Sequence, residues 1–167
     1  MRRIYLIGFM GAGKTTVGRA LAALLHWEFV DLDAEIEREQ GITIREIFEK
    51  LGEPRFRQIE RETLKTVSKR TDAVIAVGGG AYIDPENRAI ADSAGLTVWL
   101  KVSFANAVSR VTIGGARPLF QDREKAERLY HDRLPFYRRA RLHVSADGES
   151  PEAIAREIDA LIAPYRS

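Results

Sequence analysis

The sequence predicts a doubly wound α/β fold, in which a mostly parallel sheet is buried between layers of helices. Short apolar runs alternate along the chain with segments of helical periodicity, and this alternation is typical of such folds. The apolar runs are hydrophobic on both faces, as strands are when helices cover a sheet on each side. With 167 residues and no internal repeat, the chain is expected to form one domain.

Strands and helices follow from local patterns. The expected strands are Arg3–Gly8, Glu28–Val30, Ala73–Val77, Thr97–Val102 and Leu142–Val144. Apolar residues spaced by three and four predict an amphipathic helix over Glu53–Ser68. The residues Thr43–Glu46 have the form of a capping box. Asp84–Pro85 and Ser150–Pro151 each place a cap residue before a proline that suits the first helical position.

Composition limits the compartment and the partners. The chain has no cysteine, which excludes disulfides and thiolate chemistry and suits a reducing cytosol. Its apolar runs are far too short to span a membrane, and the N-terminal residues lack the apolar core of a signal peptide. We therefore expect a cytoplasmic protein with no membrane partner.

Arginines account for the basic character of the chain, whose net charge is +2. They gather at Arg133, Arg138, Arg139 and Arg141. Each of them could belong to a solvated helix face. No nucleic-acid-binding signature accompanies them, so we expect no nucleic-acid partner and favour a pocket for small anions.

A phosphate-binding loop is the strongest motif. Gly8–Thr15 matches G-x-x-x-x-G-K-[ST], directly after the first strand and before the helical run Val17–Leu25. Glycines let the backbone N–H groups turn inward around phosphate oxygens, and the following helix adds the positive end of its dipole. Lysine reaches the β- and γ-phosphates, and the hydroxyl after it ligates magnesium. The expected ATP-binding residues here are Gly11, Ala12, Gly13, Lys14, Thr15 and Thr16.

Two carboxylates follow the second strand, whereas the third strand runs into glycines without an acid. Ligands of open α/β sheets bind at the carboxyl ends of strands. Asp31 is expected to serve Mg²⁺ through water beside Thr15, and Asp33 to face the acceptor hydroxyl. The alternative for either aspartate is a helix N-cap, and Asp33 could cap a helix and also bind a ligand.

Two glycine-containing segments indicate ligand contact. Gly78–Gly80 could be a plain tight turn, but three glycines cost backbone entropy and favour close approach of a substrate to the main chain. Thr112–Arg123 contains glycines and an Arg-Pro pair and has weak periodicity. It is either a surface loop or a lid whose arginine covers the phosphates.

These motifs together resemble the shikimate kinase family over nearly the whole chain. The matching stretches are G-F-M-G-A-G-K-T-T at Gly8–Thr16, F-V-D-L-D at Phe29–Asp33, F-R-Q-I-E at Phe56–Glu60, V-G-G-G at Val77–Gly80, R-P-L at Arg117–Leu119 and R-L-P-F-Y at Arg133–Tyr137. The resemblance implies a three-layer P-loop kinase fold with a five-stranded parallel sheet in the order 2-3-1-4-5. It also implies a monomer that phosphorylates shikimate with ATP and Mg²⁺, in chorismate and aromatic amino acid biosynthesis.

The resemblance also implies roles for individual residues. Asp33 would bind the accepting hydroxyl and help to remove its proton, with Lys14 and Arg117 as the other catalytic residues. The substrate-binding set would be Asp33, Arg57, Gly79, Gly80 and Arg133, with Arg110 near the adenine and Arg117 on the lid at 112–123. The substrate-binding segment would span roughly 33–61 of a single domain, 1–167.

The residues themselves agree with an acidic substrate. Arginine binds a carboxylate in a fork geometry, and Glu60 follows Arg57 by three residues, where a salt bridge can orient it. Two places depart from the family pattern. Phe120 stands where a second leucine is common, and the acidic stretch Asp147–Ser150 lies where the family meets the adenine.

Other functions remain as alternatives. A gluconate or nucleoside monophosphate kinase would share the phosphate loop and the lid. A GTP-binding switch would need an N-K-x-D motif, which the sequence lacks. A nucleic-acid-binding ATPase is suggested only by the sequence pI of about 9.0. The histidines His26, His131 and His143 are scattered and are expected to be structural.

Overall fold

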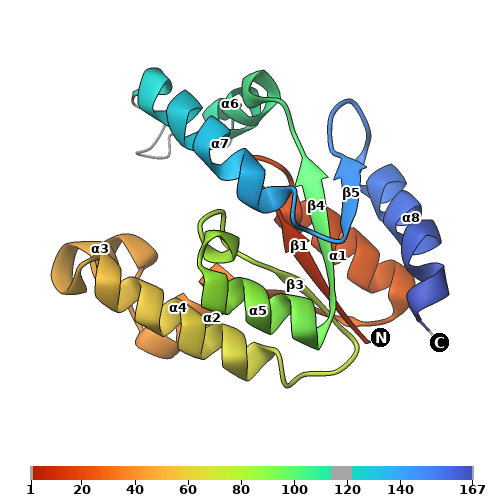
Figure 1. Cartoon of the computed structure of the whole chain (residues 1–167), viewed down its shortest axis with the longest axis horizontal. Coiled ribbons are helices and arrows are strands. Elements are labelled where there is room, and N and C mark those ends of the chain that lie inside the picture. The colour runs from red at the N-terminus through yellow and green to blue at the C-terminus, as the bar shows by residue number, and fades with distance from the viewer. Residues whose placement is uncertain (1, 114–121, 167) are drawn as a thin grey trace.

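A computed structural model describes residues 2–113 and 122–166 of the chain and confirms the predicted α/β class. Its sheet has five parallel strands in the order β2-β3-β1-β4-β5, as the family resemblance implied (Figure 1). The strands are β1 (Arg3–Ile7), β2 (Glu28–Asp31), β3 (Ala73–Ala76), β4 (Leu96–Lys101) and β5 (Leu142–Ser145). Every predicted strand is present, and each end lies within one residue of the expected one.

Helices cover both faces of this sheet. They are α1 (Lys14–Leu25), α2 (Leu32–Gln40), α3 (Ile44–Leu51), α4 (Glu53–Val67), α5 (Pro85–Ala94), α6 (Phe104–Ile113), α7 (Arg123–Tyr137) and α8 (Pro151–Ile162), with short 3₁₀ turns η1 (Ala81–Ile83) and η3 (Ala163–Tyr165). Helices α1 and α8 pack against each other on one face, and α4 and α5 lie together on the other (Figure 1). Helix α3 extends from this second layer and packs on α4.

The predicted caps are confirmed. The Thr43 hydroxyl accepts a hydrogen bond from the Glu46 amide at 3.1 Å and starts α3. Asp84 and Ser150 accept from the amides of the first turns of α5 and α8 in the same way. These side chains satisfy N–H groups that a helix start would otherwise leave without a partner.

The predicted lid, Thr112–Arg123, is helical at both ends of the segment. Thr112 and Ile113 belong to the last turn of α6, and Arg123 is the first residue of α7. These three residues are therefore helical, whereas the weak periodicity had suggested a loop or a lid. Arg117 and the rest of the segment lie outside the described residues.

Register brings the ends of the central strands to one edge. In β1, Leu6 pairs with Ala76 of β3 and with Val98 of β4, while Asp31 of β2 also pairs with Ala76. The carboxyl ends of β1, β2 and β3 therefore lie side by side, at the edge where open α/β sheets bind ligands. Within residues 2–113 and 122–166, no helix is both long enough and apolar enough to cross a lipid bilayer.

Candidate active site

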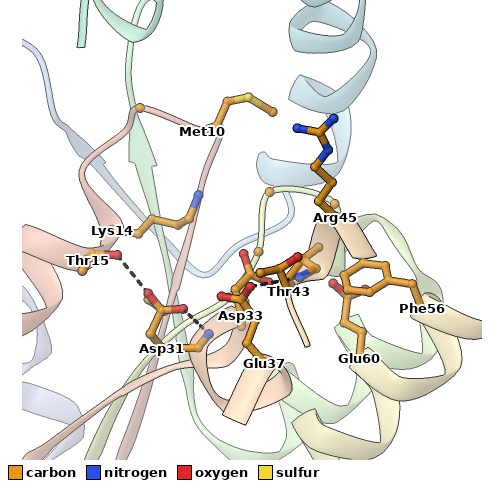
Figure 2. A pocket seen from close by; sticks show the side chains of 18 of the residues that line it. Met10, Lys14, Thr15, Asp31, Asp33, Glu37, Thr43, Arg45, Phe56 and Glu60 are labelled. Atoms are coloured by element: carbon orange, nitrogen blue, oxygen red, sulfur yellow. Dashed lines mark hydrogen bonds between the residues drawn. The ribbon is translucent and has the colours of Figure 1, made fainter. Parts of the chain in front are cut away.

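A cavity of about 700 Å³ lies at this edge of the sheet (Figure 2). Its walls come from the loop after β1, the ends of β2 and β3, and helices α2, α3, α4 and α7. Most of the predicted site residues line it: Gly11, Gly13, Lys14, Thr15, Thr16, Asp31, Asp33, Arg57, Gly79, Gly80 and Arg133. Segments far apart in the sequence thus meet at a single cavity.

The phosphate-binding loop has the backbone that its glycines predict. Gly13 caps α1 with a φ of 90°, and Gly11 has a φ of 80°. This left-handed region is unfavourable for residues with a Cβ, so glycine is required at both positions. The Lys14 ammonium donates to the carbonyls of Gly8 at 2.6 Å and Phe9 at 3.2 Å, which holds the charge over the loop.

Oxygen atoms suited to a magnesium ion lie next to this loop. The Thr15 hydroxyl donates to Asp31 Oδ2 at 3.1 Å, and Asp31 Oδ1 accepts from the Ala34 amide at 3.2 Å. No cluster of three or more His, Asp or Glu side chains that could hold a metal occurs in the described part of the chain. Mg²⁺ keeps several waters and usually takes only one or two protein oxygens besides phosphates, so this pair fits it.

The same hydrogen bonds settle which aspartate caps the helix. Asp31 is the N-cap of α2, whereas Asp33 is already inside its first turn. The possibility that Asp33 caps the helix is therefore wrong. Its carboxylate points into the cavity instead (Figure 2).

The glycine triplet provides space rather than unusual backbone angles. Gly78, Gly79 and Gly80 are not among the residues with positive φ, and Gly80 has an ordinary φ of −96°. The segment does turn, because the Ala81 amide bonds the Gly78 carbonyl at 3.0 Å. That turn alone does not require glycine. What glycine provides is room, since charged groups crowd each position where a Cβ would stand.

Two guanidinium groups converge on the triplet. A methyl group on Gly80 would lie 2.7 Å from Arg57 Nη2 and 3.2 Å from Arg133 Nη2. Helix α4 carries the first of these arginines and α7 the second. The predicted salt bridge from Arg57 to Glu60 is confirmed, with 2.9 Å between Nη1 and Oε1. Guanidinium groups are suited to binding carboxylates, so the chemistry of this point matches an anionic ligand.

Glu60 is a site residue that the sequence analysis treated only as a partner of Arg57. Its side chain is 1% exposed, and burial raises its pKa. The Arg57 guanidinium opposes this shift, while the carboxylates of Asp33 and Asp84 add to it. Glu60 and Asp33 flank Gly78, since a methyl there would lie 3.6 Å and 3.1 Å from their oxygens. The sequence did indicate that Glu60 would be buried, because Glu60 falls on the apolar stripe of α4, four residues after Phe56.

Ring stacking forms an apolar wall on the α3 side of the cavity. The rings of Phe48 and Phe56 lie 4.6 Å apart between centroids, and both line the cavity. Glu37 accepts a hydrogen bond from the Ile44 amide at 3.0 Å, which ties α2 to the start of α3. Residues 33–61 thus contribute acidic, basic and apolar surfaces to this cavity.

A second cavity of about 230 Å³ adjoins the outer side of the phosphate-binding loop. Ala12 and Arg110 line it, as does Glu149 from the acidic stretch before α8. Arg110 donates to the carbonyls of Gly11 and Ala12 at 3.1 and 3.2 Å, and to Ala146 at 2.5 Å. Glu149, which belongs to the acidic stretch that departs from the family pattern, therefore faces this second cavity.

Asp147 in the same stretch has a structural role. Its carboxylate accepts from the Ser103 amide at 3.1 Å and from the Asn106 side chain at 2.7 Å. These bonds join the loop after β5 to the start of α6. They also place Arg110, which lies further along that helix.

Comparisons with known proteins agree on one family. A family model described as shikimate kinase matches residues 10–163. A shikimate kinase of Moorella thermoacetica is 42% identical, over 93% of this chain and 91% of the relative. One from a Synechococcus species is 45% identical, over 92% of this chain and 82% of the relative.

Solved structures show the same similarity. Shikimate kinase from Acinetobacter baumannii in complex with shikimate has a TM-score of 0.93 and 39% identity, covering 99% of this chain and 95% of that one. A gluconokinase from Sinorhizobium meliloti has a TM-score of 0.62 at 19% identity, over 98% of this chain and 93% of that one. This second likeness extends to the fold alone.

Proposed function

The chain belongs to the shikimate kinase family, and on this basis we propose that it transfers the γ-phosphate of ATP to a hydroxyl of shikimate. The products are shikimate 3-phosphate and ADP, in chorismate and aromatic amino acid biosynthesis. The observation that carries this proposal is the cavity with a phosphate-binding loop on one side and two converging guanidiniums on the other. A nucleoside triphosphate matches the side with the phosphate-binding loop, and a small organic acid matches the side with the guanidiniums.

The donor side of the reaction uses the phosphate-binding loop. Backbone N–H groups of residues 11–16 surround the phosphates, and the Lys14 ammonium lies where charge develops on the transferring group. Arg117 is proposed to add a second cation from the lid at 112–123. Arg110 and the smaller cavity beside it would take the adenosine moiety.

The acceptor side holds the organic acid by its carboxylate. Arg57 and Arg133 would bind it, while backbone groups of Gly79 and Gly80 contact the ring. Asp33 faces the same space and would accept the hydroxyl proton on a carboxylate oxygen. The hydroxyl oxygen then bonds to the γ-phosphorus as the bond from phosphorus to the β–γ bridging oxygen breaks, and ADP leaves. Positioning and charge stabilisation account for most of the acceleration in such reactions.

We propose Mg²⁺ as the metal of this reaction, held by Thr15 and, through water, by Asp31. When bound, it would neutralise charge on the β- and γ-phosphate oxygens. The protein's own part is to hold the Thr15 hydroxyl and the Asp31 carboxylate 3.1 Å apart in a fixed orientation. The hydrogen bond that the Ala34 amide donates to Asp31 supports this orientation.

We further propose that residues 1–167 act as a single cytoplasmic domain and as a monomer, with shikimate and ATP as its substrates. The absence of cysteine is compatible with a reducing compartment. Sedimentation of the purified protein at several concentrations checks the monomer. A mass that rises with concentration would contradict it.

The decisive experiment measures ADP release by a coupled assay with ATP and Mg²⁺. Shikimate should stimulate release strongly over the reaction without an acceptor. Gluconate and nucleoside monophosphates, the acceptors of the alternative kinases, should not. Release that is independent of shikimate, or greater with another acceptor, would refute the proposed function.

A further inference from the structure

Within the described part of the chain, a hydrogen bond ties the backbone of the glycine triplet to another element at a single point. The carbonyls of Gly78 and Gly80 bond within their own turn, to the amides of Ala81 and Ile83 at 3.0 and 3.3 Å. The Gly79 carbonyl instead accepts a hydrogen bond from the Tyr137 hydroxyl at 2.5 Å. Among residues 2–113 and 122–166, no other bond joins the triplet backbone to a different element. One phenol therefore links this loop to helix α7.

Tyr137 is well placed to hold that link rigidly. Its side chain is fully buried, and its ring packs on Trp99 with 6.1 Å between centroids. Burial raises the pKa of the phenol to about 12, although the Arg133 guanidinium opposes the shift. The hydroxyl therefore keeps its proton throughout the physiological range and remains a donor. It sits one helical turn after Arg133.

The orientation of one peptide unit follows from this bond. In a trans peptide the C=O and the next N–H point in opposite directions. Holding the Gly79 carbonyl against Tyr137 therefore turns the Gly80 N–H away from the core. No hydrogen bond engages that N–H within the described part of the chain, and Gly80 lines the cavity beside Arg57 and Arg133.

From this geometry we propose that Tyr137 is a positioning residue for the acceptor, which fixes the Gly79–Gly80 peptide and, on the same helix, the place of Arg133. Tyr137 is not among the residues that line the cavity. It determines where the groups that bind the substrate stand. The inference rests on the proposed function, because it assigns Tyr137 to the acceptor half of that reaction.

The simpler alternative is that the phenol only stabilises the core. Tyr5 offers a matched comparison, because it is also fully buried and donates a hydrogen bond, to the Ser68 hydroxyl at 2.7 Å. Neither Tyr5 nor Ser68 lines the cavity. Replacing either tyrosine by phenylalanine removes one buried hydroxyl and keeps the ring. The two variants should thus lose stability alike and differ only in catalysis.

The experiment compares wild type, Tyr137→Phe and Tyr5→Phe by steady-state kinetics, with circular dichroism and thermal melting as checks of folding. For Tyr137→Phe we expect kcat/KM for shikimate to fall roughly tenfold. Loss of the hydrogen bond to the Gly79 carbonyl would loosen the glycine triplet and misplace the acceptor. Its KM for ATP should stay within about twofold of wild type, since the phenol bonds the Gly79 carbonyl and makes no hydrogen bond to the phosphate-binding loop at residues 8–15. Tyr5→Phe should leave both constants unchanged.

Each outcome is decisive. Equal kinetics in Tyr137→Phe and wild type, or the same loss in both tyrosine variants, would overturn the inference. So would a Tyr137→Phe protein that has lost its fold, because the phenol would then be a requirement of the core. If wild type itself fails to phosphorylate shikimate, the proposed function fails instead, and the two failures are distinguishable.

Discussion

Replacing Gly80 by alanine should separate stability from activity. The backbone there has a φ of −96° and a ψ of −9°, which alanine adopts without strain. Such a replacement restricts the unfolded chain and stabilises a protein by about 0.4–1 kcal/mol. We therefore expect the melting temperature to hold or to rise by roughly 2 °C.

Activity should move in the opposite direction. The new methyl would lie 2.7 and 3.0 Å from the two terminal nitrogens of Arg57 and 3.2 Å from Arg133 Nη2, so both side chains must shift. It would also occupy space at the carboxylate site. A misplacement of about 1 Å costs roughly 100-fold, or about 2.7 kcal/mol of transition-state stabilisation. We expect that loss in kcat/KM for shikimate, with the KM for ATP unchanged.

Gly41→Ala is the matched control. Gly41 has a φ of 71° at the end of α2, and nothing lies within 4 Å of where its Cβ would be. Alanine there should cost about 1 kcal/mol through backbone strain and lower the melting temperature by about 3 °C, yet leave the kinetics intact. Steady-state assays and thermal melts of both variants check the pair. A fully active Gly80→Ala enzyme would refute the convergence of the arginines on the acceptor.

Three further predictions concern the charged residues. Asp33→Asn should abolish phosphoryl transfer while ATP binding, measured by calorimetry, is retained; surviving transfer would make Asp33 structural. Arg117→Ala should lower kcat by at least about tenfold, and an unchanged kcat would remove Arg117 from the mechanism. Burial raises the pKa of Glu60, so the wild type loses stability as the pH rises through the folded-state pKa of Glu60. The melting temperature of Glu60→Gln relative to the wild type should therefore increase as the pH rises above about 4.5, the pKa of an unburied glutamate, and a difference that shrinks with pH would contradict this.

Local patterns predicted the fold well because its elements are locally determined. The central strands β1, β3 and β4 are apolar runs, and the caps at Thr43, Asp84 and Ser150 use side chains that bond amides two or three residues away. Helix α7 was harder to predict because Pro135 lies in it, and proline normally indicates a helix end. Here the proline falls in the last turn, where the helix is about to end in any case.

Which aspartate caps α2 could not be decided from the sequence. Asp31 and Asp33 are both able to accept from a helix amide, and the answer depends on a shift of two residues in where the helix begins. The structure resolves this through the bond between Asp31 and the Ala34 amide. As a result Asp33 lies inside the first turn of α2 and lines the cavity.

Contacts between distant segments account for the other residues that the sequence could not place. Arg110 was expected near the adenine, yet its guanidinium also bonds carbonyls of the phosphate-binding loop, about 100 positions earlier in the chain. The bond from Tyr137 to Gly79 spans 58 positions. The periodicity of apolar residues along a sequence does not indicate such pairs. A buried tyrosine looks the same in sequence whether it fills the core or holds a loop.

Charge balance at the acceptor end favours an organic acid over a neutral alcohol. Arg57 and Arg133 reach within 3.2 Å of one point, the position of a methyl on Gly80, and two cations so close repel each other. Arg57 pairs with Glu60 at 2.9 Å and with Glu53 at 3.7 Å, whereas no ion pair engages Arg133 among the described residues. The carboxylate of an acceptor would supply an anion for Arg133, which a neutral alcohol would not. Selectivity for acids is therefore expected to arise from where the arginines meet, in a fold that other kinases share.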